Sequence, residues 1–294
     1  MRITNQMIFD QAQTQAAAAR DRASVAQDQV ATGIRVVHPS DDPAAAGLMV
    51  SQKMAIQRYD VIDQSISRAS GELQTADGAL QSVSTLLARA QQLAVQLGND
   101  TYGKAERLAG AQEIASISTQ IAQLMNTQVA GRYIFGGNVD NAPPFDAARN
   151  YSGDTTVRQV EVAPGLLQDA AVRGDDAVKG TAGGVDVFTV LGSLATALTN
   201  DDGVNIRASI DGVSQSTTQV AASLTKTGAI MSALDSAQKI GTVAKDSTQK
   251  VLSAESEVDI FAAASNLAQA QQSLQAALAA TAKSFDTNLL NFLK

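Results

Sequence analysis

Apolar residues recur at alternating spacings of three and four over most of the chain, and the pattern reaches close to both ends. A helix turns once every 3.6 residues, so this spacing places the apolar side chains in one stripe along each helix. A period near 3.5 residues predicts closely aligned helix pairs with a left-handed twist. The stripes cover residues 9–30, 62–97, 114–124, 206–234 and 260–277.

The outermost stripes consist mostly of alanine, whereas the inner ones carry leucine, isoleucine and valine. Burying a leucine or isoleucine side chain contributes roughly 1.5–3 kcal/mol, and alanine contributes far less. We therefore expect the inner stripes to hold a bundle within one chain, and the terminal helices to become ordered by packing against other subunits. The side chains expected at this subunit contact are Phe9, Ala12, Ala16, Ala19, Ala23, Ala26, Val30, Leu267, Ala270, Leu274 and Leu278.

Composition excludes several classes of protein. Of the 294 residues, 45% are hydrophobic but only 4% are aromatic, and cysteine is absent. Disulfide bonds and thiol catalysis are therefore excluded. The net charge of -7 argues against nucleic-acid binding, because nucleic-acid binders need a basic face to release counterions from phosphates. No stretch approaches the roughly 20 apolar residues of a membrane span, so we expect no membrane insertion.

A connector should follow the first helix. Gly33 suits the left-handed residue that ends many helices, and residues 34–43 contain two prolines and two adjacent aspartates. Asp42 is placed to cap the next helix, with Pro43 at its first position. We expect Gly33, Arg35, Asp41, Asp42 and Pro43 to form a structural connector. The second helix should run from residue 43 towards residue 98, with a disturbance near residue 71, and a third from about residue 102 to residue 130.

The pattern changes after residue 131, where glycine, asparagine and proline break any helix. Residues 156–162 alternate like a half-buried strand, residues 163–165 predict a turn, and Val172 and residues 185–187 are candidates for further strands. Val187, Leu191, Leu194 and Leu198 predict a short helix, followed by a turn at residues 201–203 and two long helical stretches.

These elements predict a mainly α fold with a small β-rich insert. The N- and C-terminal segments should form an elongated antiparallel bundle of long helices, with coiled-coil-like helices at the two ends. We expect three parts: terminal helices at residues 1–33 and 258–294, a long-helix bundle at residues 34–135 and 187–257, and a β-rich insert at residues 136–186.

The residues of catalysis are scarce. His38 is the sole histidine, which removes paired-histidine zinc sites and the HExxH motif. The aspartate pairs beginning at Asp41, Asp175 and Asp201 lie at expected caps or turns, where aspartate accepts backbone hydrogen bonds. The glycine-rich residues 180–184 lack the lysine and hydroxyl of a phosphate-binding loop. We expect no enzyme activity, cofactor or metal site.

Several motifs carry a resemblance to a known family. The opening Met1-Arg2-Ile3-Thr4-Asn5-Gln6-Met7 with Phe9, the segment Ala31-Thr32-Gly33-Ile34-Arg35, and Pro39-Ser40-Asp41-Asp42-Pro43 resemble the N-terminal region of the flagellin superfamily. Residues 259–293 are similar to the family's C-terminal helix. The segment Gly131-Arg132-Tyr133-Ile134-Phe135-Gly136-Gly137, with Tyr151-Ser152-Gly153-Asp154, is closer to the junction proteins of this superfamily than to filament flagellins. The sequence departs from the family at Val36-Val37-His38.

The resemblance implies a structural protein of the bacterial flagellum at the hook-filament junction. It implies export by the flagellar type III apparatus, assembly of the chain with itself into a short ring between hook-associated protein 1 and flagellin, and an export chaperone bound through the C-terminal helix. The opening residues lack the apolar core of a secretory signal peptide, which fits that route or a cytoplasmic location. The alternatives are a filament-forming flagellin, a cytoplasmic coiled-coil scaffold, and an enzyme using His38, Asp41 and Asp42.

Overall fold

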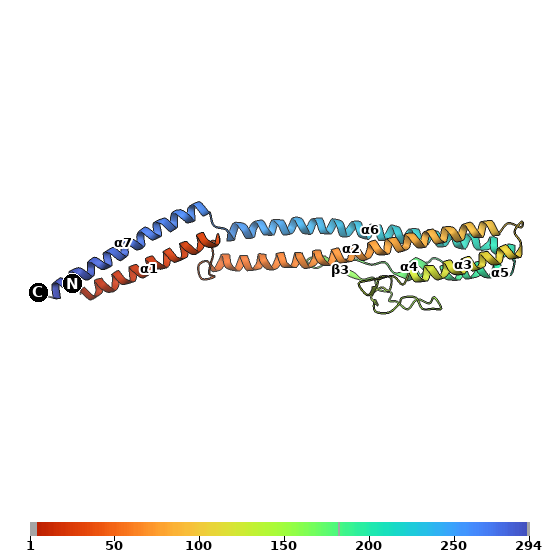
Figure 1. Ribbon diagram of the computed structural model, residues 1–294, viewed down its shortest axis with the longest axis horizontal. Helices are drawn as coiled ribbons and strands as arrows, with labels where there is room; N and C mark the ends of the chain where they lie inside the picture. Colours follow the sequence, from red (N-terminus) through yellow and green to blue (C-terminus); the bar gives the residue numbers. More distant parts are fainter. Residues whose placement is uncertain (1–4, 182, 293–294) are drawn as a thin grey trace. The chain divides into compact units, whose positions relative to one another are not determined.

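The computed structural model of the chain describes residues 5–181 and 183–292, and helices account for 72% of it. This confirms the mainly α fold with small antiparallel sheets (Figure 1). The helices are α1 (Asn5–Thr32), α2 (Pro43–Leu97), α3 (Lys104–Leu124), α4 (Gly174–Val178), α5 (Val187–Thr199), α6 (Gly203–Ser256) and α7 (Ile260–Phe292). The strands are β1 (Gln128–Val129), β2 (Arg132–Tyr133), β3 (Gln159–Ala163) and β4 (Leu166–Asp169). Among the described helices, none has the length and apolar character needed to cross a membrane.

The chain forms two compact units. The first, which we call the terminal unit, contains residues 1–57 and 244–294, and the second, the central unit, contains residues 58–243. The division therefore falls within α2 and α6. The three-part division expected from the sequence stays a prediction.

The core of the central unit is built from the inner apolar stripes. Leu80, Leu87 and Ile114 have no exposed surface, and they share one cluster with the apolar faces of α5 and α6. Leu191, Leu194 and Leu198 from α5 are buried in the same cluster. Each such side chain contributes roughly 1.5–3 kcal/mol when removed from water, so the inner stripes stabilise the bundle within one chain.

The hairpin of β3 and β4 covers a second apolar cluster. Val162 of β3 and Ala170, just after β4, are buried together with Ile66 and Leu73 of α2 and Leu234 of α6. Gly165 makes the turn with a positive φ of 80°, a conformation that favours glycine. An ion pair between Arg158 and the buried Glu72 also joins the hairpin to α2.

Local predictions differ from the structure at several places. Helix α3 ends at Leu124, because the chain turns into the β1–β2 hairpin through Ala130 and Gly131, both with positive φ. The strand predicted from residue 156 begins at Gln159, and β4 was missed because Leu166 and Leu167 are both exposed and do not alternate. Val172 is buried outside any strand and Val187 begins α5. Helix α2 continues through Gly71 without a break.

Aromatic side chains pack together in the core of the central unit. Phe135 is fully buried and Phe145 is 2% exposed. The ring of Phe145 lies 5.4 Å from that of Tyr151 and 5.6 Å from that of Phe188, centroid to centroid. Burial raises the pKa of Tyr151 well above its usual range. Gly174 leaves the space these rings need, because a Cβ there would lie 2.8 Å from Phe145 Cε2.

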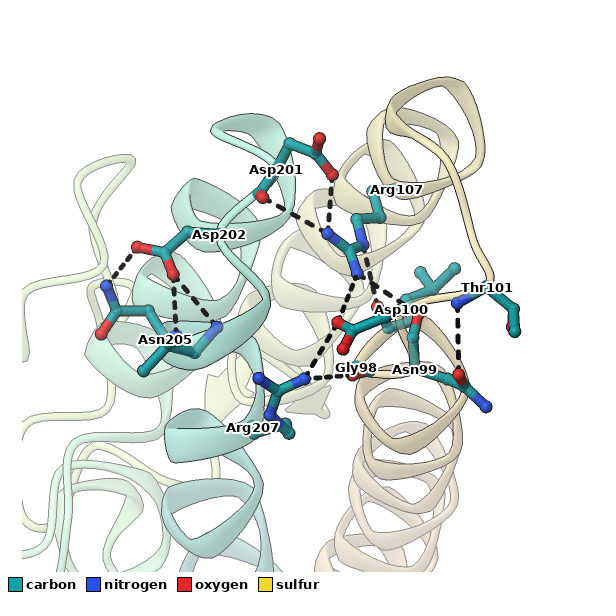
Figure 2. Close-up of polar contacts among 11 residues, drawn as sticks. Gly98, Asn99, Asp100, Thr101, Arg107, Asp201, Asp202, Asn205 and Arg207 are labelled. Carbon is teal, nitrogen blue, oxygen red and sulfur yellow. Dashed lines mark hydrogen bonds and ion pairs between the residues drawn. The ribbon is translucent and has the colours of Figure 1, made fainter.

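A buried arginine joins two loops at one end of the central unit (Figure 2). Arg107 Nε donates to Leu97 O at 3.0 Å and Nη2 donates to Asn99 O at 3.2 Å. From the other loop, Asp201 accepts from Nη1 through its carboxylate at 2.7 Å. One guanidinium therefore satisfies carbonyls left free at the end of α2 and also holds the α5–α6 turn.

Ser118 provides a test of packing in α3. It is 3% exposed, and its hydroxyl is the buried side-chain polar atom without a hydrogen-bond partner among the described residues. A buried polar group left unpaired costs free energy. Ser118→Ala is therefore expected to leave the free energy of unfolding unchanged or raise it by up to about 1 kcal/mol in urea denaturation. A loss of more than about 1 kcal/mol would show that the hydroxyl has a partner.

Candidate assembly surfaces

Helices α1 and α7 lie side by side in the terminal unit (Figure 1). Their contact is lined by small side chains: Ala19 and Ala23 are each 8% exposed, Ala26 is 7% exposed, and Ala263 of α7 is 1% exposed. A cleft of about 270 Å³ runs along this contact, lined by Ala19, Arg22, Ala26, Asn266, Gln269, Ala270 and Ser273. The two helices therefore pack closely but bury little apolar area against each other, because alanine side chains are small.

The structure brings most residues of the expected subunit contact together along this seam. Ala19, Ala23 and Ala26 are buried, whereas Leu278 is 54% exposed. The side chain of Phe9 lies outside the described residues. The remaining residues of the set are partly buried: Ala12, Ala16, Val30, Leu267, Ala270 and Leu274. Their contact with other subunits stays a prediction.

Large apolar side chains lie on the outside of the same helix pair. Phe261 is 89% exposed, Ile260 is 61% exposed and Val25 is 38% exposed. Residues 260–282 also contain no charged residue. Sequence reasoning missed Phe261 because it lies one residue away from the stripe that contains Ile260. The lack of charge along α7 was the available signal, since interface cores are depleted of charged residues.

The first connector is held by the residues that the sequence singled out. Gly33 has a positive φ of 68° after the last turn of α1. Asp42 caps α2, because its Oδ1 accepts from Ala45 N at 3.0 Å, and Pro43 is the first residue of that helix. Asp41 has a different partner: its Oδ2 accepts from His38 N at 2.9 Å, which closes the turn.

Arg35 joins this connector to the second one, between α6 and α7. Its Nη1 donates to Asp42 Oδ2 at 3.1 Å and its Nη2 to Glu255 Oε2 at 3.4 Å. Arg35 N donates to Ser256 O at 2.7 Å, and Val258 N donates to Gly33 O at 3.0 Å. We call this set of contacts the connector clasp. Glu255, Ser256 and Val258 could not be assigned from sequence, because their partners lie more than 200 residues away.

The clasp makes the stability of the terminal unit depend on Asp42. The Ala45 N–H and the Arg35 guanidinium hold the pKa of Asp42 below its usual range. A lowered folded-state pKa adds stability above the usual pKa, near 4, and this stability is lost as the pH falls through the folded value. Asp42→Ala is therefore expected to lower the melting temperature at pH 7, measured by circular dichroism. The further drop in melting temperature below about pH 4 should be smaller in this variant than in the unchanged chain. Asp21→Ala, an exposed change on α1, is the control and should leave both unchanged.

An enzyme at the connector would use His38, Asp41 and Asp42. The His38 side chain is 63% exposed and its Nδ1 lies 3.8 Å from Asp41 Oδ2, while Asp42 is engaged by the cap and by Arg35. In the part of the chain that the structure describes, no group of three or more histidine, cysteine, aspartate or glutamate side chains could hold a metal ion.

The comparisons with known proteins agree with this architecture. Residues 3–140 match the bacterial flagellin N-terminal helical region. Over this region the chain is similar to bacterial flagellins. It is 32% identical to flagellar hook-associated protein 3 of Salmonella typhimurium over 162 residues. This aligned region covers 54% of this chain and 51% of that relative. The chain thus spans about half the length of the first curated relatives it matches.

Two further comparisons cover more of the chain. The flagellin of Bacillus subtilis is 26% identical over 287 residues, which covers 91% of each chain. The crystal structure of Bacillus cereus FlgL matches with a TM-score of 0.56 and 25% identity, covering 68% of this chain and 99% of that one. The relatives therefore include both a hook-associated protein and a flagellin.

Proposed function

We infer that the chain is a structural adaptor of the bacterial flagellum at the hook-filament junction. It assembles with itself into a short ring that links hook-associated protein 1 to flagellin. The similarity to flagellar hook-associated protein 3 and to Bacillus cereus FlgL supports this assignment. The chain acts through the geometry of its interfaces and performs no catalysis.

The observation that carries this proposal is the contrast between the two sides of the α1–α7 pair. The inner seam buries alanines, while Phe261, Ile260 and Leu278 are exposed. Two helices with so thin a contact gain little from packing against each other alone. Neighbouring subunits that covered the exposed apolar side chains would supply the missing burial, which is the expected behaviour of a subunit that completes its terminal unit on assembly.

The proposal assigns a role to each part of the chain. Residues 1–33 and 258–294 form the inner layer of the ring, residues 34–135 and 187–257 form its surrounding bundle, and residues 136–186 form the outer surface. The chain reaches the extracellular flagellum through the flagellar type III apparatus, with a chaperone bound to the C-terminal helix before export. Detection of the chain in the cytoplasm alone would contradict this route.

Deletion of the gene tests the function directly. Cells lacking the chain should carry hooks without filaments and should release flagellin into the medium, as seen by electron microscopy and immunoblotting. A plasmid copy should restore filaments. Normal filaments on the deletion strain would refute a junction role.

A filament-forming flagellin is the second candidate, because the similarity to Bacillus subtilis flagellin extends over 91% of each chain. The two functions predict different amounts of protein. A flagellin would be the main component of filaments sheared from cells, whereas a junction protein would be scarce in that fraction and confined to the filament base.

A further inference from the structure

The seam between α1 and α7 repeats itself every seven residues. On α1 the inward positions are the pairs 12 and 16, 19 and 23, and 26 and 30, which are alanine except for Val30. On α7 they are the pairs 263 and 267, 270 and 274, and 277 and 281, which alternate alanine with leucine or threonine. A shift of one heptad would therefore place alanine against nearly the same neighbours. The seam itself contains little information about register.

Polar contacts do not supply that information either. Between the described residues 10–30 and 260–281, no side-chain hydrogen bond joins α1 to α7. Bonds such as Thr14 Oγ1 to Asp10 O and Thr281 Oγ1 to Ala277 O, both at 2.7 Å, stay within one helix. Helix pairs with a defined register commonly use a buried polar residue or complementary charges for that purpose. Between residues 10–30 and 260–281 the seam has neither, because α7 carries no charge there and its inward positions are alanine, leucine or threonine.

The contacts that fix position along the helix axis lie in the connectors. Ile34 pairs with Glu257 in an antiparallel bridge, and Arg35 adds its guanidinium bonds to Glu255. Gln29 in the last turns of α1 also donates to Arg35 O at 2.8 Å. These bonds hold the C-terminal end of α1 at one fixed point beside the start of α7.

The connectors differ in the movement they would allow. Three residues, 257–259, separate α6 from α7, whereas ten residues, 33–42, separate α1 from α2. A ten-residue segment can extend to about 33 Å. A heptad shift moves a helix by about 10.5 Å along its axis. Without the clasp, the long connector therefore leaves α1 free to move to the next alanine register.

We propose that the connector clasp, centred on Arg35, selects the register of α1 against α7. The alanine side chains let the two helices pack closely, and the contacts of the clasp determine which residues of α1 lie opposite which residues of α7. This is a conformational device of the chain itself and does not depend on its role in the flagellum.

Engineered cysteine pairs test this in the full-length chain, which contains no cysteine of its own. Val258 N donates to Gly33 O, and the two helices run in opposite directions from that point. Ala26 precedes Gly33 by seven residues and Asn266 follows Val258 by eight, and both line the cleft, so Ala26→Cys with Asn266→Cys reports the observed register. Ala26→Cys with Ser273→Cys reports α1 displaced by one heptad, since disulfide formation requires Cα atoms within about 7 Å. The effective concentration of each pair, measured in a glutathione redox buffer, gives the relative population of the two registers. Fraying of the helices lowers both values together and leaves their ratio unchanged.

In the otherwise unchanged chain, the observed-register pair should have the higher effective concentration by at least about tenfold. Arg35→Ala should lower this ratio by about tenfold, and Glu255→Ala should lower it by a smaller factor. Arg20→Ala is the matched control, because it removes the same charge from an exposed site on α1 and should leave the ratio unchanged. Equal values for the two pairs before any clasp mutation, or an unchanged ratio in Arg35→Ala, would overturn the proposal.

Discussion

Arg107→Met is expected to lower the free energy of unfolding by about 2–4 kcal/mol, because the substitution leaves the buried Leu97 O and the partly buried Asn99 O without a donor and removes the ion pair with Asp201. The guanidinium is the shared partner of Leu97 O, Asn99 O and the Asp201 carboxylate (Figure 2), and the Arg107 side chain is 7% exposed. Methionine fills a similar volume but offers no hydrogen-bond donor. Urea denaturation followed by circular dichroism measures the change.

Arg207 is the matched control at the same end of the unit. It donates to Gly98 O at 2.9 Å, but its side chain is 49% exposed, so water can replace that donor. Arg207→Met should therefore cost no more than about 1 kcal/mol. Equal losses from the two substitutions would show that burial of Arg107 does not decide its contribution.

Phe145→Ala is expected to cost about 3–5 kcal/mol, the usual result of removing a buried aromatic ring. The ring is 2% exposed and packs against Tyr151 and Phe188. Its loss leaves a cavity beside Tyr151 and Phe188. Urea denaturation measures the loss, and a cost below about 1 kcal/mol would mean that the site collapses around alanine.

Phe261→Ala makes the same chemical change at a site that is 89% exposed. It should leave the free energy of unfolding of the purified chain within about 0.5 kcal/mol of the original, as expected of a surface substitution. If neighbouring subunits cover this side chain, the same variant should reduce filament formation in cells. Normal motility would remove Phe261 from the proposed subunit contact.

Much of the helical framework could be predicted from sequence, because long helices carry their information in local repetition. The stripe in residues 62–97 predicted a buried face that includes Leu73, Leu80 and Leu87. Gly33, Asp42 and Pro43 marked the end of one helix and the start of the next, since caps depend on a few neighbouring residues. The structure confirms these boundaries.

The features that were missed depend on partners distant in sequence. Arg107 lies one heptad before Ile114 on the buried face of α3, but the apolar stripe does not include a charged residue. Its carboxylate partner Asp201 is 94 residues away. Nothing in the sequence distinguishes Glu255 from the other polar residues of its long helix. Its role follows from its hydrogen bond with Arg35. Strand β4 is short and its side chains do not alternate between buried and exposed, so local periodicity could not detect it.

The alanine seam was only partly predictable. Its spacing indicated one continuous face, and the structure places that face between α1 and α7 of the same chain. Periodicity identifies which residues share a face, but it does not identify the partner helix. Contact with neighbouring subunits therefore stays a proposal that rests on the exposed apolar side chains.

The antiparallel bridge between Ile34 and Glu257 also has a mechanical consequence. Hydrogen bonds in an antiparallel pair lie perpendicular to the strands, so a force that pulls the two connectors past each other loads Arg35 N–Ser256 O and Val258 N–Gly33 O at the same time. Hydrogen bonds that share a shear force resist the movement jointly, and they break at nearly the same force. Under axial tension the joint should therefore yield abruptly at a threshold force, whereas a flexible linker would lengthen gradually.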